Sequence, residues 1–149
     1  MSLSLQNVTA DNVGQACRIT VAPEQMGFVS PVAESLAEAY TQPDTAWPRL
    51  IFRGDHAVGF VMAGFDSRSP LWFFRCGIWR LNVSAAAQRQ GVGRFAAAAV
   101  FDEARSRGFA RASVLWIRGD AGPEDFYLRL GFRPTGEIFD NQVIAAIDL

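Results

Sequence analysis

The chain has 149 residues, of which 50% are hydrophobic and 19% are charged, and its formal net charge is −1. This composition excludes a disordered chain and predicts one domain, residues 1–149, with a substantial core. Because 14 basic residues are offset by 15 acidic ones without a long basic run, we expect no nucleic-acid partner.

The same sequence gives no sign of a membrane or metal partner. No apolar run approaches the roughly 18 residues of a membrane span, and the N-terminus lacks the basic and apolar regions of a signal peptide. Cys17 and Cys76 lie far apart and outside C-x-x-C spacing, which argues against a disulfide framework or a thiolate metal site. We therefore expect a soluble, cytoplasmic protein without a bound metal.

The first third of the chain predicts one strand and two helices. Residues 3–8 alternate apolar and polar side chains as a half-buried strand does, and Thr9 or Asp11 can cap a helix that reaches about Thr20. Pro31 suits the first turn of a second helix through Tyr40, since proline lacks the N–H that would be unpaired there. Pro43 and Pro48 then predict a loop.

The middle of the chain predicts strands. Residues 49–53 and 57–65 read as a hairpin joined by a short glycine turn. Residues 71–83, rich in aromatic and β-branched side chains, predict a third long strand, in which Gly77 marks either a bulge or a turn that splits it.

A long helix and four shorter elements complete the prediction. The helix runs from Gly91 to Arg107 and ends at Gly108. It is followed by a strand, a short helix and a terminal strand pair, at residues 110–117, 123–130, 132–137 and 143–149. Antiparallel strands followed by a strand-helix-strand crossover predict a mixed α/β (α+β) fold, with helices on both sides of the sheet.

The segment from Leu81 to Arg94 carries the strongest functional pattern. An apolar strand enters a basic loop with Gly91 and Gly93, and a helix follows, so backbone N–H groups, the helix dipole and arginines can together hold a pyrophosphate. A P-loop is excluded, because Arg94 stands where Lys is required. A dinucleotide fingerprint fits only on paper, since residues 84–90 separate the strand from the first glycine.

The remaining interpretation is Gln/Arg-x-x-Gly-x-Gly/Ala, filled by residues 88–93, which resembles the acetyl-CoA loop of the GNAT superfamily of N-acetyltransferases. Residues 125–132, Asp-Phe-Tyr-Leu-Arg-Leu-Gly-Phe, resemble the family's downstream signature at the family's spacing. The resemblance implies a GNAT-like, mostly antiparallel splayed sheet of about six to seven strands flanked by about four helices. It also implies acetyl-CoA as cosubstrate and a possible homodimer.

The resemblance assigns a cofactor site and an acid. Main-chain groups of the strand before the loop would pair with pantetheine, and the loop would hold the pyrophosphate, which gives the cofactor-binding set Leu81, Asn82, Val83, Gln88, Arg89, Gln90, Gly91, Val92, Gly93, Arg94, Asp120 and Phe126. Asp120 stands near a position where the family often has Asn, and it can instead cap the following helix. Tyr127 is the predicted catalytic residue, since a phenol can protonate the departing CoA thiolate; its alternative is a packed helix tyrosine.

The acceptor is predicted to be a primary amine of a small molecule. Residues 21–40 are similar to a subgroup of diamine or polyamine acetyltransferases, which implies substrate-binding roles for Glu24, Phe28 and Glu34. Glu34 can equally form a solvated helix face with Glu38. No carboxylate lies on residues 71–83, so the general base stays unassigned among Asp66, Glu24 and Glu34. Alternative functions are an acyl-CoA-binding regulatory module without turnover and an enzyme acting on a protein or peptide amine.

Overall fold

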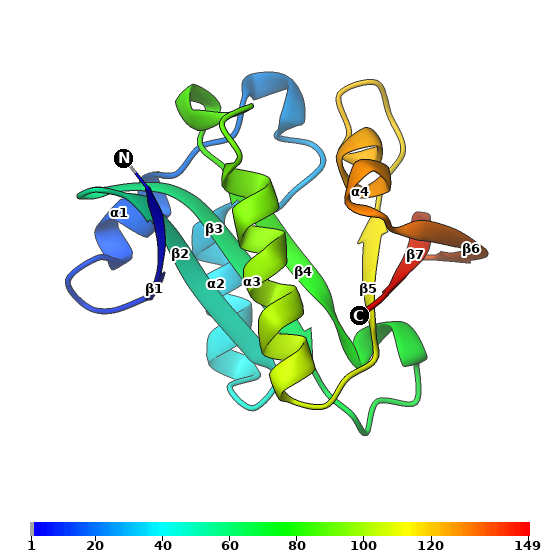
Figure 1. The fold of residues 1–149 in the computed structure, drawn as a ribbon. Coiled ribbons are helices and arrows are strands. Elements are labelled where there is room, and N and C mark those ends of the chain that lie inside the picture. The colour runs from blue at the N-terminus through cyan, green and yellow to red at the C-terminus, as the bar shows by residue number, and fades with distance from the viewer. Residues whose placement is uncertain (1) are drawn as a thin grey trace.

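A computed structural model describes residues 2–149, which form one seven-stranded sheet with helices on both faces (Figure 1). The strand order is β1-β2-β3-β4-β5-β7-β6, and every neighbouring pair is antiparallel except the parallel pair β4 and β5. The strands are β1 (Leu3–Asn7), β2 (Ala46–Arg53), β3 (His56–Phe65), β4 (Cys76–Val83), β5 (Arg111–Trp116), β6 (Arg133–Phe139) and β7 (Gln142–Asp148).

The described residues contain four α-helices, which are α1 (Val13–Arg18), α2 (Val32–Thr41), α3 (Val92–Ser106) and α4 (Glu124–Leu130). Figure 1 shows α3 in front of the sheet and α2 behind it. The expected fold class, a mixed and mostly antiparallel sheet flanked by about four helices, is therefore confirmed. None of the helices described in residues 2–149 is long and apolar enough to cross a membrane.

The core is divided by the sheet. One cluster of buried side chains lies under α3 and includes Val61, Val92 and Val100. A second cluster, on the α1 and α2 face, includes Phe60 and Met62. Period-two alternation of β3 sends successive side chains to opposite faces, so this one strand supplies both clusters.

The expected strand over residues 71–83 is wrong in its first part. Trp72–Phe74 forms a 3-10 turn, and β4 begins only at Cys76. The Ser113 hydroxyl donates a hydrogen bond to the Phe73 carbonyl at 2.6 Å, and the Phe73 and Phe74 rings pack edge to face. Aromatic content, which is usual in strands, here serves a side-chain cluster instead.

Gly77 is neither a bulge nor a break. It lies inside β4, where a Cβ atom would come within 2.4 Å of the Ser113 carbonyl oxygen, so only glycine allows this approach. The register irregularity lies two residues later, where Met62 pairs with Arg80 and Ala63 with Ile78, leaving Trp79 unopposed.

Pro48 lies inside β2 rather than in a loop. The pairing of β1 with β2 stops at Arg49, so β2 has a strand neighbour on one side only at Pro48. A proline is tolerated there, because no β1 carbonyl needs its missing N–H.

The two cysteines are predicted to react very differently with thiol reagents. Cys17 is exposed, whereas Cys76 is buried and burial raises its thiol pKa to about 11. The thiolate is the reactive form, so at pH 8 we expect rapid labelling of Cys17 alone, and labelling of both thiols in denaturant. Mass spectrometry of the labelled protein checks this, and a Cys17→Ser variant that still labels rapidly when folded would contradict it.

Candidate active site

The main cavity lies where β4 and β5 separate. Their parallel pairing comprises Gly77 with Ser113 and Ile78 with Val114, and beyond these residues the strands diverge (Figure 1). Residues 80–83 therefore have no strand neighbour on the β5 side within the described chain. A cavity of about 950 Å³ occupies the opening.

The glycine loop forms one wall of this cavity. Gly91 adopts φ +84° and Arg89 adopts φ +62°, and α3 begins at Val92. A non-glycine residue in the left-handed region is uncommon and strained, which directs attention to the loop as a functional element. The first amides of α3 have no carbonyl partner within the helix and lie at the positive end of its dipole.

The glycine loop and the downstream signature are in direct contact. A Cβ atom on Gly93 would lie 2.9 Å from Cζ of Phe126, so the two motifs pack more closely than any other residue at position 93 would allow. Both residues line the cavity. The fold thus brings together the two segments that the sequence singled out.

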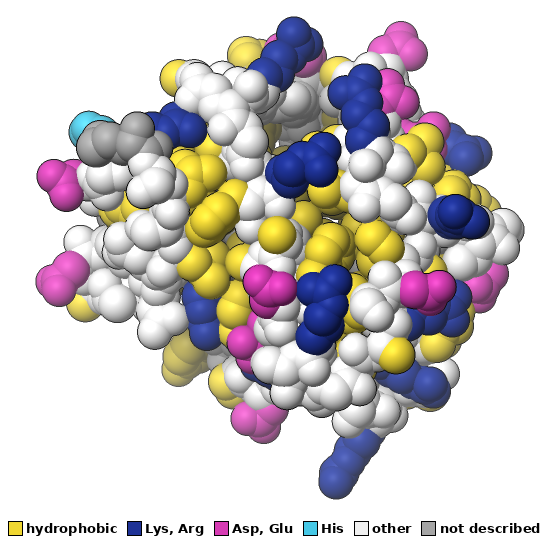
Figure 2. All heavy atoms as spheres, viewed as in Figure 1, with side chains coloured by type: hydrophobic (Ala, Val, Ile, Leu, Met, Phe, Trp, Pro, Cys, Tyr) yellow, Lys and Arg dark blue, Asp and Glu magenta, His cyan; other side chains and the backbone are white. Residues whose placement is uncertain are grey.

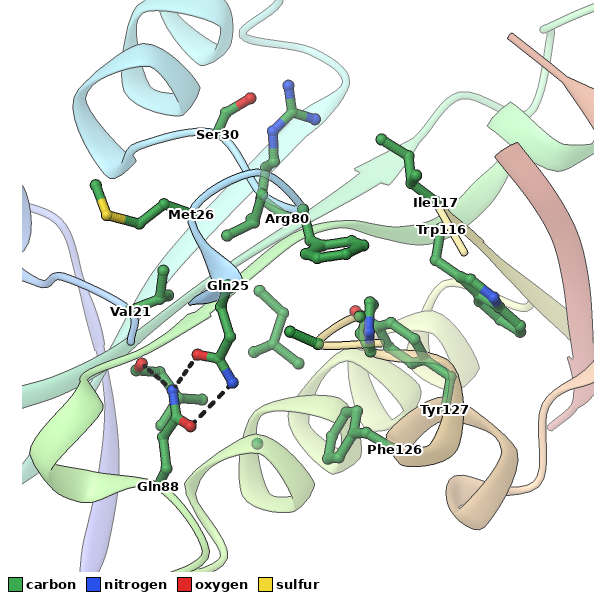
Figure 3. Close-up of a pocket in the computed structure, with 18 of the residues that line it drawn as sticks. Val21, Gln25, Met26, Ser30, Arg80, Gln88, Trp116, Ile117, Phe126 and Tyr127 are labelled. Carbon is green, nitrogen blue, oxygen red and sulfur yellow. Dashed lines mark hydrogen bonds between the residues drawn. The ribbon is translucent and has the colours of Figure 1, made fainter. Parts of the chain in front are cut away.

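Gln88, at the start of the glycine loop, is held by hydrogen bonds to Gln25 and to the end of β4. Its Nε2 donates to Gln25 Oε1 at 2.5 Å and to the Val83 carbonyl at 3.2 Å, while Gln25 Nε2 donates to Gln88 Oε1 at 3.0 Å (Figure 3). The Ala22 amide also donates to Gln25 Oε1. This amide pair links the segment between α1 and α2 to the end of β4.

Tyr127 lines the cavity from α4. Its ring stacks on Trp116, with 5.6 Å between centroids, and packs edge to face against Phe126 (Figure 3). It also packs edge to face against Phe132. The side chain is buried, which raises the phenol pKa above its ordinary value. No hydrogen bond to the Tyr127 hydroxyl is present among residues 2–149, so this neutral donor is available to a bound molecule.

Trp116 is itself held by the first residue of α4. Glu124 Oε2 accepts hydrogen bonds from Trp116 Nε1 at 2.8 Å and from Arg118 Nε at 2.8 Å. Both hydrogen bonds lower the pKa of Glu124, and the bond from Arg118 has the larger effect. The carboxylate therefore stays ionised at neutral pH. The chain of contacts Glu124, Trp116 and Tyr127 sets the plane of the phenol ring.

Removing this brace is predicted to slow turnover without weakening cofactor binding. In Glu124→Ala, Trp116 loses its acceptor and Tyr127 loses a fixed stacking partner. Because Tyr127 is the predicted catalytic residue, we expect its displacement to lower kcat about tenfold. Glu124→Gln keeps an oxygen acceptor for Trp116 and should retain most of kcat. Steady-state kinetics with calorimetric measurement of acetyl-CoA affinity test this, and equal kcat in both variants would contradict it.

The cavity is electropositive. Four arginines line it, against one carboxylate, Asp140; they are Arg80, which forms an ion pair with Glu38, and Arg89, Arg94 and Arg129. Figure 2 shows arginine side chains gathered around a hollow with apolar side chains inside it. Such an arrangement suits a ligand that joins anionic groups to an apolar arm.

The structure gathers most of the predicted site residues in this cavity. Those lining it are Leu81, Val83, Gln88, Arg89, Gly91, Val92, Gly93, Arg94, Phe126, Tyr127 and Phe28. The side chain of Asn82 points away, with Nδ2 donating to the Ser30 carbonyl at 3.0 Å. Gln90 accepts a hydrogen bond from Arg53 at the surface.

Besides Asn82 and Gln90, three more predicted residues lie outside the cavity lining in the described structure. Asp120 is exposed between β5 and α4, and Glu24 and Glu34 are exposed on the α1 to α2 segment and on α2. Glu34 therefore has the environment of a solvated helix face, the second of its two predicted roles. No group of three or more His, Cys, Asp or Glu side chains within residues 2–149 is arranged to hold a metal ion.

Sequence reasoning missed several residues that line the cavity. Gln25, Trp116, Arg129 and Asp140 reach it from four different elements or loops. Of these, only Asp140 had a local sequence signal, because an Asp-Asn pair is typical of tight hairpin turns. In the structure both residues have positive φ and form the turn of the β6–β7 hairpin.

Comparison with known proteins agrees with this geometry. A search of curated proteins gives no match, but the fold is similar to an acetyltransferase from Thermus thermophilus, with TM-score 0.77 and 19% identity over 100% of this chain and 98% of that one. It is also similar to PaiA N-acetyltransferase from Thermoplasma acidophilum, solved in complex with coenzyme A, with TM-score 0.73 and 12% identity over all of both chains. A putative GNAT acetyltransferase from Desulfovibrio desulfuricans gives TM-score 0.74 and 20% identity over 99% of both chains.

The family model of the acetyltransferase (GNAT) family matches residues 11–132, which is most of the chain. The match includes the glycine loop, β5 and α4, and therefore both walls of the cavity. The chain accordingly belongs to the acetyltransferase (GNAT) family, whose members are N-acetyltransferases with acetyl-CoA as cosubstrate.

Proposed function

We propose that residues 1–149 act as a single domain that transfers acetyl from acetyl-CoA to a primary amine of a small molecule, by direct attack in a ternary complex. The observation that carries the proposal is one cavity lined by both the glycine loop and Tyr127. A site that binds the cofactor's anionic end and presents a neutral proton donor in the same space has two of the components that acetyl transfer requires.

Cofactor binding follows from the two walls of the cleft. The free backbone groups of Leu81 to Val83 can pair with the amides of pantetheine as a further strand would. The first amides of α3, with Arg89 and Arg94, supply donors and positive charge for the pyrophosphate. Arg129, across the cavity on α4, adds a third cation.

Tyr127 supplies the acid of the reaction. The amine nitrogen forms the new C–N bond to the acetyl carbon, the C–S bond breaks, and the sulfur takes the phenolic proton. The proton lost by the amine nitrogen returns to the phenolate through solvent, so the balance is amine plus acetyl-CoA giving amide plus CoA. Burial keeps the phenol protonated before each cycle.

The similarity of residues 21–40 to diamine or polyamine acetyltransferases implied a polyamine as the acceptor. The described structure gives that class limited support, since Glu24 and Glu34 face outward and Glu38 forms an ion pair with Arg80 at 3.0 Å. Acetylation of a peptide amine and acyl-CoA binding without turnover also compete with acetylation of a small amine. The available Tyr127 hydroxyl favours an enzyme over a regulatory module that only binds acyl-CoA.

A CoA-release assay tests the proposal. Acetyl-CoA is supplied with polyamines, simple primary amines, amino acids, aminoglycosides and peptide N-termini, and acetyl-CoA binding is measured in parallel by calorimetry. We expect binding together with turnover of at least one small amine. Turnover of peptides alone would replace the acceptor class, binding without any turnover would favour the regulatory module, and absence of binding would overturn the site.

A further inference from the structure

A second cavity adjoins the main one on the α2 face of the sheet. Its volume is about 430 Å³, and it extends from the 3-10 turn at Trp72–Phe74 to the turn between β6 and β7. Five residues line both cavities, and they are Trp79, Arg80, Leu115, Asp140 and Gln142. The two cavities are therefore adjacent at the residues that follow the paired part of β4 and β5.

Aromatic side chains form the wall of the second cavity. The Phe73 and Phe74 rings lie 4.8 Å apart between centroids, and Phe139 lies 5.2 Å from Phe73 and 5.4 Å from Phe74. Phe74 and Phe139 are 42% and 38% exposed, which is unusual for phenylalanine side chains that already pack together. The indole of Trp79 completes this wall. An aromatic ring bound here would cover the exposed faces and edges with favourable offset or edge-to-face geometry.

The remaining charge in the second cavity is negative. Asp66 and Asp140 line it, and its one arginine, Arg80, is neutralised by the ion pair with Glu38. Asp140 also lines the main cavity, so this residue lies where the two cavities adjoin. A cation is favoured at that junction, whereas the main cavity, with its unmatched arginines, favours anions.

We propose that the acceptor is an arylalkylamine, whose aromatic ring occupies the second cavity and whose ammonium group reaches Asp140 at the junction with the main cavity. This inference rests on the proposed function and names its substrate class. An apolar cavity of about 150 Å³ already holds benzene, so the second cavity is large enough for a one- or two-ring group. A polyamine would leave the aromatic wall uncovered.

The first test compares primary amines with and without an aromatic ring. 2-Phenylethylamine and tryptamine are assayed against hexylamine and spermidine with saturating acetyl-CoA. We expect kcat/KM at least tenfold higher for the two aromatic amines. Equal or higher values for hexylamine or spermidine would overturn the inference and leave the acetyltransferase proposal intact.

The second test uses variants of the aromatic wall. Phe139→Ala should raise KM for 2-phenylethylamine at least fivefold, with KM for acetyl-CoA and KM for hexylamine unchanged. Ile138→Ala is the matched control, because Ile138 is the adjacent residue of β6, is 63% exposed and does not line either cavity in the described structure. Asp140→Asn, which suits the left-handed turn position, should raise KM for every amine. Unchanged KM for 2-phenylethylamine in Phe139→Ala would contradict the proposed ring site.

A binding measurement separates this inference from the proposed function. If no amine is acetylated, titration of 2-phenylethylamine into the CoA-bound protein still tests the second cavity. Binding that is lost in Phe139→Ala and kept in Ile138→Ala supports the ring site without turnover. Absence of binding, or binding that is equal in both variants, rejects it.

Discussion

Replacing Tyr127 with Phe is expected to lower kcat about 100-fold while leaving acetyl-CoA affinity unchanged. The ring would keep its stacking on Trp116, and no hydrogen bond within residues 2–149 would be lost with the hydroxyl. Only the proton for the departing thiolate is removed, and general acid catalysis is worth about 10²- to 10⁴-fold. Steady-state kinetics and calorimetry on the purified variant measure the two quantities.

The matched control is Tyr40→Phe, because Tyr40 is the other tyrosine of the chain and is 88% exposed on α2. It should behave as the wild type in both measurements. Full turnover in Tyr127→Phe would remove the acid from the mechanism and leave Tyr127 as a packed helix residue. A loss of acetyl-CoA affinity equal to the loss of kcat would instead assign it to cofactor binding.

The raised pKa of Tyr127 also fixes the direction of a pH effect. An exposed phenol ionises near pH ~10, as in the unfolded chain, whereas the buried phenol remains protonated. The contribution of Tyr127 to stability is therefore complete below pH ~10 and is lost as the pH rises above it. Tyr127→Phe should lose less stability than the wild type between about pH 10 and 11, measured by urea denaturation.

Local patterns explain what the sequence predicted well. The glycine loop depends on backbone conformations that particular residues permit, such as φ +84° at Gly91, and on a helix that starts directly after it. Both requirements are written within a few consecutive residues. For the same reason the α3 boundaries, the β2–β3 hairpin and the placement of Tyr127 on a short helix followed from sequence alone.

Contacts between residues far apart in the sequence account for the features that the sequence did not predict. Gln25 and Gln88 are 63 positions apart, and the residues next to them in the sequence do not predict their pairing. Glu124 holds Trp116 through a side-chain bond across a loop, and the strand pattern of β5 identifies Trp116 only as apolar. Local propensity favours a strand at Phe73 and Phe74. The contacts that instead hold them in a turn, with Ser113 and Phe139, come from residues far away in the sequence.

The residues around the acceptor are the least predictable part of the site, because the sequence does not show whether a charged side chain faces solvent, a cavity or another side chain. Glu34 and Glu38 are one helical turn apart on α2, yet Glu34 faces solvent and Glu38 pairs with Arg80. Asp140, in the β6–β7 turn, lines both cavities together with Arg80, which lies on the distant strand β4. The carboxylates near an acceptor are thus determined by the packing of separate elements.

Replacing Gly77 with Ala is expected to destabilise the protein by about 3 kcal/mol or more, the upper range for overpacking a core. The new Cβ would lie 2.4 Å from both the carbonyl oxygen and Oγ of Ser113. Ser113 cannot move aside freely, because its hydroxyl donates to the Phe73 carbonyl at 2.6 Å and also lies 3.2 Å from the Cys76 carbonyl oxygen. The strain therefore falls on the backbone pairing of β4 with β5. Urea denaturation followed by far-UV circular dichroism measures the change.

Gly64→Ala is the matched control, because Gly64 pairs directly with Gly77 across β3 and β4. Its Cβ would meet nothing closer than the Trp79 ring at 3.7 Å, so we expect a change within about 0.5 kcal/mol. Gly77→Ala should also weaken acetyl-CoA binding, since the paired residues at Gly77 and Ile78 are where the two walls of the cleft are joined. If Gly77→Ala were as stable as Gly64→Ala, β4 and β5 could not approach as closely as described. The position of the cleft, which depends on that approach, would then need another explanation.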